Sequence, residues 1–341
     1  MRFGLFHTVQ WPAGHSQVDV YSDALREAVL AEELGLDSVW LTEHHFSRHG
    51  IISDSLAVLA HLAGLTSRIR LGTAVAVLPF HNPVRLAETA ATVDVLSGGR
   101  LDFGIGRGYQ WSEFAGFGVD MSERGDRFAE ALDVIVRAWA VDSSVGPHGR
   151  YWQFGDVDPQ PKPVQQPHPP IWVATDSADG LRRCAEQDYG VLLPQGRSLD
   201  VVADQVARYR RSLEEAGKSY DPAKVILARA LYVDESDDRA WEVAGQPYLS
   251  FLERAMSLAR PPDGSSAAVN PFDTEDVRDA VVFGSPTTCA SQLSRIVDLG
   301  IDHVLFFIRF SELSHDRIVR SLGRFASDVA PAVRESKAVA V

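Results

Sequence analysis

Short apolar runs alternate with longer amphipathic stretches along the 341 residues of the chain, and this alternation limits the possible folds more than any other feature. The runs lack strict polar alternation, which is typical of parallel strands that are buried on both faces. Eight runs are expected as strands: 2–8, 37–42, 69–78, 101–106, 170–175, 190–193, 225–233 and 303–310. Helices are expected over 20–35, 54–66, 83–97, 122–139, 199–216, 286–299 and 315–329, with two more that end near residues 187 and 258.

Repeated strand–helix units predict an α/β fold with a parallel sheet. The count of eight favours a closed (β/α)8 TIM barrel, and the length of the chain suits one such domain over residues 1–341 with insertions. A doubly wound open sheet would fit the same pattern. The absence of a GxGxxG motif after the first strand favours the barrel.

Two stretches interrupt the pattern. Residues 148–170 hold six prolines, so an extended insertion is expected after the fourth strand. Residues 260–273 are rich in Pro, Gly and Ser and follow the seventh strand. They are expected to form a mobile lid loop at the carboxyl end of the barrel, weakly ordered without ligand. An interdomain linker is the alternative for each stretch.

The charge balance disfavours two classes of partner. Lys and Arg number 33 against 46 Asp and Glu, which gives a net charge of −13, and no basic run occurs. Nucleic acid and anionic membranes select for clustered cations, so neither is an expected partner. Cys184 and Cys289 lack metal or disulfide spacing and fit buried residues in a reducing cytoplasm. No signal-peptide or membrane-span pattern appears.

The second strand ends in Glu43, His44, His45 and Phe46. Imidazole titrates near neutral pH, and active sites of barrels form at strand carboxyl ends, so these residues are candidates for proton transfer. Adjacent strand residues point to opposite faces, so His44 and His45 should have different tasks. A packed histidine is the structural alternative. One histidine pair is a weak metal signal, and no metal site is expected.

Three further strand ends suggest a flat phosphorylated ligand. Small residues at Gly72, Thr73 and Ala74 would let a flat ligand approach the backbone, or would merely fit the barrel interior. Arg107 between two glycines can grip a phosphate, or can lie in a surface turn.

Thr175, Asp176 and Ser177 precede a helix, where they can form an anion site or an ordinary N-cap. Aromatic residues that would line an apolar substrate pocket are Phe6, Phe46, Tyr109 and Trp111. FMN is the simplest cofactor that fits the combination.

At these residues the chain resembles the bacterial luciferase-like family, and the luciferase α subunit in particular. The resemblance covers nearly the whole chain and includes the stretches 3–6, 37–46, 72–79, 82–88, 94–100, 103–108, 284–286 and 325–331. It implies a flavin-dependent monooxygenase with His44 as a general base and a cis peptide bond between Ala74 and Val75 under the flavin ring. It also implies that Arg107 and Ser177, with Arg124 nearby, hold the FMN phosphate.

The chain departs from the family at two positions. Gly106 stands where luciferase has a cysteine beside the flavin, which argues against efficient light emission. Gly180 stands where a threonine belongs to the phosphate segment, and Asp176 takes the place of its acidic residue. A weaker or differently made phosphate grip is expected.

The resulting hypothesis is a monooxygenase that uses O2 and FMNH2 to oxidise an aldehyde, ketone or other lipophilic small molecule. A separate flavin reductase is expected because the sequence has no second nucleotide-binding unit. An F420-dependent hydride-transfer enzyme and a non-catalytic flavin-binding subunit remain alternatives. A cytoplasmic homodimer is expected.

Overall fold

The structure is a computed structural model that describes the chain except residues 141–144, 147–148, 265–276, 311–312 and 340–341. Its strands are β1 (Arg2–His7), β2 (Ser38–Leu41), β3 (Arg70–Thr73), β4 (Ala76–Val77), β5 (Leu101–Gly106), β6 (Ile171–Ala174), β7 (Gly190–Leu193), β8 (Val225–Val233), β9 (Val281–Gly284) and β10 (His303–Phe307). Its α-helices are α1 (Gln17–Glu33), α2 (Ser55–Leu65), α3 (Pro83–Leu96), α4 (Trp111–Phe117), α5 (Arg124–Trp139), α6 (Ala178–Gln187), α7 (Leu199–Glu215), α8 (Asp237–Ala259), α9 (Pro286–Asp298), α10 (His315–Arg324) and α11 (Ala330–Val339).

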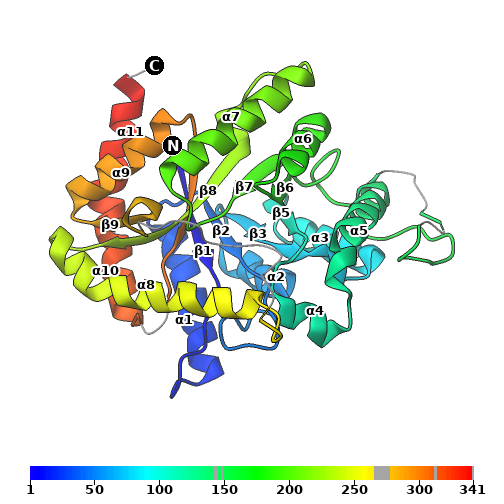
Figure 1. The fold of residues 1–341 in the computed structure, drawn as a ribbon, viewed down its shortest axis with the longest axis horizontal. Coiled ribbons are helices and arrows are strands. Elements are labelled where there is room, and N and C mark those ends of the chain that lie inside the picture. The colour runs from blue at the N-terminus through cyan, green and yellow to red at the C-terminus, as the bar shows by residue number, and fades with distance from the viewer. Residues whose placement is uncertain (141–144, 147–148, 265–276, 311–312, 340–341) are drawn as a thin grey trace.

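Parallel strands close a barrel in the order β1, β2, β3, β5, β6, β7, β8 and β10, and β10 pairs with β1 to complete the ring. Helices lie outside the strands, as Figure 1 shows. The predicted TIM barrel is confirmed, and the eight ring strands are the eight that the sequence predicts. None of the helices in the described ranges is long and apolar enough to cross a membrane.

Several local predictions were wrong. The expected strand 69–78 is divided into β3 and β4, and between them the Ala74–Val75 peptide bond is cis, as the family resemblance implies. The last ring strand ends at Phe307 rather than at residue 310. The final helix is interrupted by a π-helix over Phe325–Val329 and continues as α11.

Among the described residues, helix α4 and strand β9 have no counterpart in the elements expected from the sequence. Helix α4 has seven residues and ends at Gly118, whose φ of 65° is left-handed, so it is too short to show helical periodicity. Strand β9 has four residues and pairs with the second half of β8, whereas β10 pairs with the first half. The unusual length of β8 is what provides both pairings.

Residues 149–170, in the stretch expected to be an extended insertion, contain no helix. Glu130 of α5 accepts the backbone N–H groups of Arg150, Tyr151 and Trp152 at 2.7–3.2 Å. Further along, Gln165 bonds to Asp94 of α3. The stretch is therefore held against the outer helices. Of the expected lid, residues 260–264 follow α8 and residues 265–273 lie outside the described residues.

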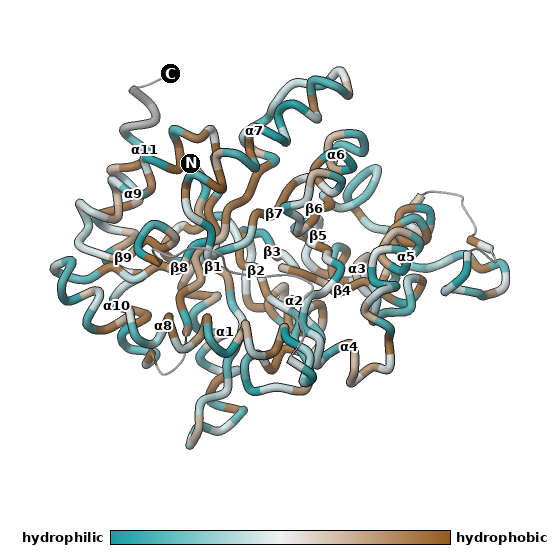
Figure 2. Tube along the Cα trace, in the orientation of Figure 1, coloured by the Kyte–Doolittle hydropathy of each residue, from teal (hydrophilic) through white to brown (hydrophobic). Residues whose placement is uncertain are grey.

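Apolar side chains fill the lower part of the barrel. Trp40, Trp172, Leu192, Ile226 and Leu305 form a buried inner cluster, against which Phe6, Ala74 and Val75 pack. Gly72 makes room for Trp40, because a Cβ atom at Gly72 would lie 2.2 Å from the indole ring. Figure 2 shows the central strands as mostly hydrophobic and the helices around them as mixed. A cavity lies next to this cluster, at the carboxyl ends of the strands.

Candidate active site

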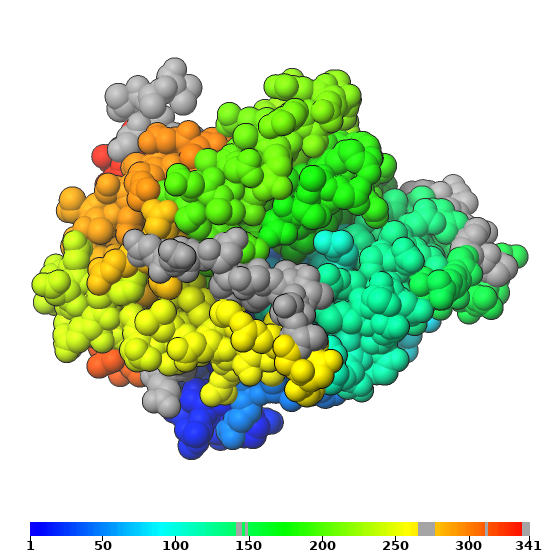
Figure 3. Space-filling view, viewed as in Figure 1, coloured from blue at the N-terminus to red at the C-terminus, as the bar shows by residue number. Residues whose placement is uncertain are grey.

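A cavity of about 260 Å³ opens where the barrel strands end. Its walls include residues that directly follow β1, β2, β3, β5, β6 and β7, which is the usual position of active sites in this architecture. Helices α4, α5 and α8 contribute Glu113, Arg124 and Phe251. In Figure 3, α8 (yellow), α4 and α5 (blue-green) and α6 and α7 (green) surround the middle of the visible face.

Most of the residues singled out from the sequence meet in this cavity. The proposed catalytic and substrate residues that line it are Glu43, His44, Phe6 and Tyr109. The proposed cofactor residues that line it are Ala74, Val75, Arg107, Arg124, Thr175 and Asp176. The other four, His45, Phe46, Trp111 and Ser177, are not among its lining residues.

His45 and Phe46 belong to a separate aromatic group. The His45 ring lies edge-on against Phe117 with 4.7 Å between ring centroids, and its Nε2 atom is 3.0 Å from Glu43 Oε1. Phe46 packs against Phe117 as well and is 66% exposed. Because neither side chain reaches the cavity, the structure gives His45 a supporting position beside Glu43 and does not place Phe46 in a substrate pocket.

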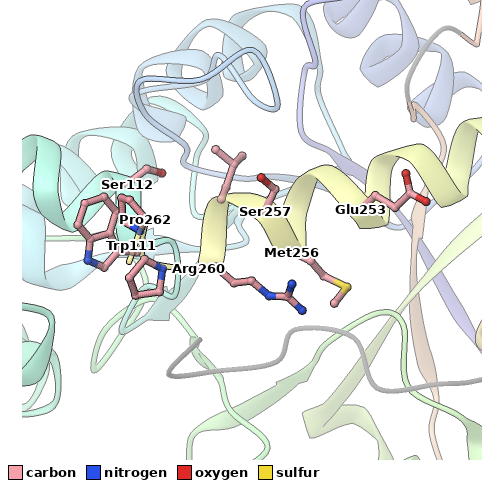
Figure 4. Close-up of a pocket in the computed structure, with 9 residues that line it drawn as sticks. Trp111, Ser112, Glu253, Met256, Ser257, Arg260 and Pro262 are labelled. Carbon is pink, nitrogen blue, oxygen red and sulfur yellow. The ribbon is translucent and has the colours of Figure 1, made fainter. Parts of the chain in front are cut away.

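Trp111 lines a different hollow, of about 600 Å³, between the start of α4 and the end of α8. Figure 4 shows Glu253, Met256 and Arg260 on the α8 side of this hollow. Although it is the larger space, it contains no histidine and no buried pair of titratable side chains. The smaller cavity is therefore the candidate active site, and Trp111 lies outside it.

His44 is held by protein groups on its Nδ1 side. Nδ1 lies 3.0 Å from Glu113 Oε1 and 3.0 Å from the side-chain nitrogen of Gln110. The same carboxylate oxygen accepts the backbone N–H of His45 at 2.9 Å. An ionised Glu113 can only accept, which favours the tautomer of neutral His44 with its proton on Nδ1. In that tautomer the Gln110 amide turns its oxygen, which otherwise has no partner among the described residues, toward Nδ1. The Nε2 atom of His44 then keeps a lone pair, as a general base requires.

Both carboxylate oxygens of Glu43 already bind protein groups, so neither is available to a substrate. The carboxylate accepts the backbone N–H of Val77 at 3.1 Å and contacts the Nε2 atoms of His45 and His81. Burial opposes its ionisation, but the bonds from His45 and His81 outweigh burial and hold the pKa of Glu43 below its ordinary value. Burial likewise opposes the charge of His81, and Glu43 nevertheless raises its pKa. The bond from Val77 joins the end of β2 to β4, and the ion pair joins it to His81, which follows the 3-10 turn after β4.

Arg107 and Arg124 make another part of the cavity wall cationic. Nη1 of Arg124 is buried and has no hydrogen-bond partner among the described residues. Burial, and then the positive charge of Arg107, lower the pKa of Arg124. Asp176 is paired with Arg197 at 2.8 Å, so its charge is already compensated. Two neighbouring guanidinium groups with a buried donor left over fit a phosphate.

The start of α6 adds hydroxyl groups to this cationic part of the wall. Ser177 caps the helix by accepting the N–H of Gly180 at 3.2 Å, and its Oγ atom lies 3.2 Å from Thr175 Oγ1. A side chain at position 180 would collide with that threonine, because a Cβ atom there would lie 2.0 Å from Thr175 Oγ1. Thr175 thus fills the space in which the resemblance leads one to expect a threonine at position 180.

Several residues of the site were missed in the sequence. Glu113 lies on α4, which was not predicted, and His81 follows the short β4. His49 lines the cavity five positions after His44, inside a loop that no periodic pattern places. Arg197 follows the end of β7, so the strand-end argument that identified Arg107 could have found it.

Comparison with known proteins agrees with the fold. Residues 1–303 match the family described as luciferase-like monooxygenase. The oxygenase component of the flavin-dependent trigonelline monooxygenase of Acinetobacter baylyi is 29% identical, over 99% of this chain and 97% of the relative. An alkanal monooxygenase alpha chain of Photorhabdus luminescens is 26% identical, over 99% of this chain and 98% of the relative.

Solved structures give the same result. The monooxygenase RslO1 of Streptomyces bottropensis has a TM-score of 0.86 and 28% identity, with 97% of this chain and 99% of that chain covered. An F420-dependent secondary alcohol dehydrogenase shares the fold at a TM-score of 0.76 and 20% identity, with 98% and 99% covered. The extent of the family match decides the assignment: the chain belongs to the luciferase-like monooxygenase family.

Proposed function

We propose that the protein is an FMNH2-dependent monooxygenase that oxidises an uncharged lipophilic aldehyde, ketone or related small molecule with O2. The observation that supports this best is the composition of one cavity. Its walls include His44 held by Glu113, the flat Ala74–Val75 segment, and the Arg107–Arg124 pair with an unpartnered buried donor within the described residues. A planar cofactor with a phosphate group fits these walls, because the flat segment suits its ring and the two arginines suit its phosphate.

Each part has its own task in this proposal. Arg107, Arg124 and the hydroxyl groups at the start of α6 would hold the phosphate of FMN, and Ala74 and Val75 would lie under its ring. Reduced FMN, when bound, supplies the two electrons that let O2 give one oxygen atom to the substrate and the other to water. His44 accepts or returns a proton at Nε2, while Glu113 keeps the Nδ1 proton in place. The apolar barrel interior below keeps water from the ring.

The proposal includes a separate flavin reductase as partner, and we infer that both proteins act in the cytoplasm. The relative from Acinetobacter baylyi is named as an oxygenase component, which supports a two-component system. We also propose that the chain forms a homodimer. F420 is the competing cofactor, because an F420-dependent enzyme shares the fold.

Anaerobic titration tests the cofactor directly. The protein is titrated with FMNH2 and, separately, with reduced F420, and affinity is measured by fluorescence. We expect FMNH2 to bind and F420 to bind at least tenfold more weakly. Turnover is then followed with a flavin reductase, NADH, FMN and a panel of aldehydes, ketones and aromatic polyketides. Preferred binding of F420, or substrate reduction without oxygen uptake, would support the hydride-transfer alternative instead.

A further inference from the structure

His49 is a cavity residue to which the proposed chemistry gives no task. Its side chain is 1% exposed and lines the same cavity as His44. Phe251 of α8 stacks on its ring, with 4.7 Å between centroids and an interplanar angle of 19°. The His44 ring lies edge-on at 5.7 Å. The imidazole is therefore held on its face and at its edge, and its orientation is fixed before any ligand binds.

One ring nitrogen of His49, Nδ1, is buried and has no hydrogen-bond partner among the described residues. Burial is the main reason that the pKa of His49 is lowered to about 3, with electrostatic effects of the neighbouring His44 and of Arg254 as lesser causes. The ring is thus neutral near neutral pH and offers one N–H donor and one acceptor nitrogen.

A second polar group nearby is also without a partner. Thr42 lines the cavity two residues before His44, and its Oγ1 atom is buried with no hydrogen bond within the described parts of the chain. Buried polar groups in folded proteins are nearly always paired, because an unpaired one costs free energy. Two such groups in the wall of one cavity can be satisfied by water or by the polar group of a ligand that enters the cavity.

The surroundings limit what that ligand can be. The carboxylates at this end are already occupied, since Glu113 binds His44 and the His45 N–H, and Glu43 binds His45 and His81. Among the described residues that line this end, no carboxylate is left free to bind a cation, and Arg254, whose positive charge acts on His49, is exposed and lies outside the lining. Tyr109, Phe6 and Phe251 line the same cavity with aromatic rings, which favour a flat apolar body.

We propose that His49 is a substrate-recognition residue that, with Thr42, binds the hydroxyl or carbonyl oxygen of an uncharged aromatic substrate. This deepens the proposed monooxygenase function and rests on it. A neutral imidazole can donate to a carbonyl, or accept from a phenol with one nitrogen while the other stays a donor. Since His44 lies beside His49, the recognised oxygen lies within the part of the cavity where a proton can be taken up or given back.

Equilibrium binding of three probes tests the proposal. The FMN-loaded protein is titrated calorimetrically with 2-naphthol, naphthalene and 2-naphthoate, which share one ring system and differ in their polar group. We expect 2-naphthol to bind about tenfold more tightly than naphthalene, and the charged carboxylate to bind most weakly.

The variant His49→Phe keeps a ring against Phe251 and removes both nitrogens. We expect it to weaken 2-naphthol binding about tenfold and to leave naphthalene binding within twofold. His49→Gln, which retains a donor and an acceptor, should recover part of the loss. His61→Phe makes the same chemical change at an exposed position of α2 and should alter no probe.

A preference for 2-naphthol that survives in His49→Phe overturns the role of His49. A wild-type protein that does not prefer 2-naphthol over naphthalene overturns the substrate class. FMN affinity is measured in the same samples and should stay within twofold in every variant. Failure of the protein to bind FMN would instead count against the monooxygenase function, which separates the two kinds of failure.

Discussion

Two glycines of the site have no room for a side chain: Val75 fills the space beside Gly106, and Thr175 fills the space beside Gly180. A Cβ atom at Gly106 would lie 2.5 Å from Val75 Cγ2, and one at Gly180 would lie 2.0 Å from Thr175 Oγ1. Both positions are departures from luciferase, where larger residues are expected. Val75 therefore occupies the space that a cysteine side chain at position 106 would need, and Thr175 the space that a threonine at position 180 would need.

The competition for space between position 106 and Val75 can be tested by substitution. We expect Gly106→Cys to lower the free energy of unfolding by about 1–3 kcal/mol, because the thiol overpacks against Val75. Adding Val75→Ala should recover most of that loss. Urea denaturation of both single variants and the double variant gives the coupling free energy, expected to be at least about 1 kcal/mol. Additive effects of the two substitutions would show that the two positions do not compete for space.

His44 and Arg107 are predicted to separate chemistry from binding. His44→Ala should lower product formation about 10²–10⁴-fold and leave FMNH2 affinity within a few-fold, since only proton transfer is lost. Arg107→Ala should weaken FMNH2 binding about 10- to 100-fold, because charge-assisted bonds to phosphate are lost, and retain the rate at saturation. Anaerobic titration and single turnover with O2 measure the two quantities. A His44→Ala protein that loses flavin but keeps its rate would assign the histidine to cofactor binding.

Helix α1 is joined to the barrel through one buried carboxylate. Glu27 lies 2.6 Å from His7 Nε2 of β1 and 2.9 Å from His315 Nδ1 of α10, and it also accepts from Arg309. Burial opposes its charge, but hydrogen bonds from His315 and His7 and the positive charge of Arg309 hold the pKa of Glu27 well below its usual range. The elements β1 and α1, together with Arg309 and His315 far along the chain, therefore depend on this one negative charge.

The pH dependence of stability follows from these shifts. The lowered pKa of Glu27 stabilises the fold above its unfolded value of about 4.3, and this stabilisation is lost as the pH falls below it. The pKa of His315 is raised, chiefly by its bond to Glu27, so its contribution is complete below about 6.5 and is lost as the pH rises. We expect the urea midpoint to be highest between these two values.

The variant Glu27→Gln tests how far Glu27 causes the loss of stability at acid pH, which we call the acid limb. It should cost about 3–5 kcal/mol, because the buried cations lose their acceptor, and it should flatten the decrease in stability between pH 5.5 and about 3.5. Glu33→Gln, on the exposed part of the same helix, should change neither quantity. An unchanged acid limb in Glu27→Gln would mean that other carboxylates control it.

The elements of the barrel could be predicted because each ring strand is an apolar run that stands out from its amphipathic neighbours. Helix α4 and strand β9 could not, since each is shorter than the window in which periodicity can be recognised. Because α4 was not predicted, part of the site was missed. His44 and Arg107 could be found because they follow strand ends. Glu113 belongs to α4, and His49 belongs to a loop whose position depends on its packing against Phe251 of α8.

At the scale of the whole molecule, the surface of α2 and α3 has an apolar area. Leu65 at the end of α2 is 48% exposed, and Val95 and Leu96 at the end of α3 are 44% and 60% exposed. The two helices pack against each other. Exposed apolar groups gathered on neighbouring helices are typical of a surface that another molecule covers. A second copy of the chain is the occupant we propose, because a two-fold pair of one surface is the commonest way for a soluble protein to bury such an area.

We therefore expect the protein to be a dimer in solution and Leu96→Asp to shift it toward monomer, since a charge in an apolar contact is costly to desolvate. Sedimentation equilibrium across a range of concentrations measures the mass directly. Val18→Asp introduces the same charge at a residue that is 77% exposed on α1 and should leave the mass unchanged. Because one chain supplies all the residues that line the cavity and Leu96 is not among them, the monomeric variant should still bind FMNH2. A wild-type protein that stays monomeric, or a Leu96→Asp protein that stays dimeric, would remove α2 and α3 from the interface.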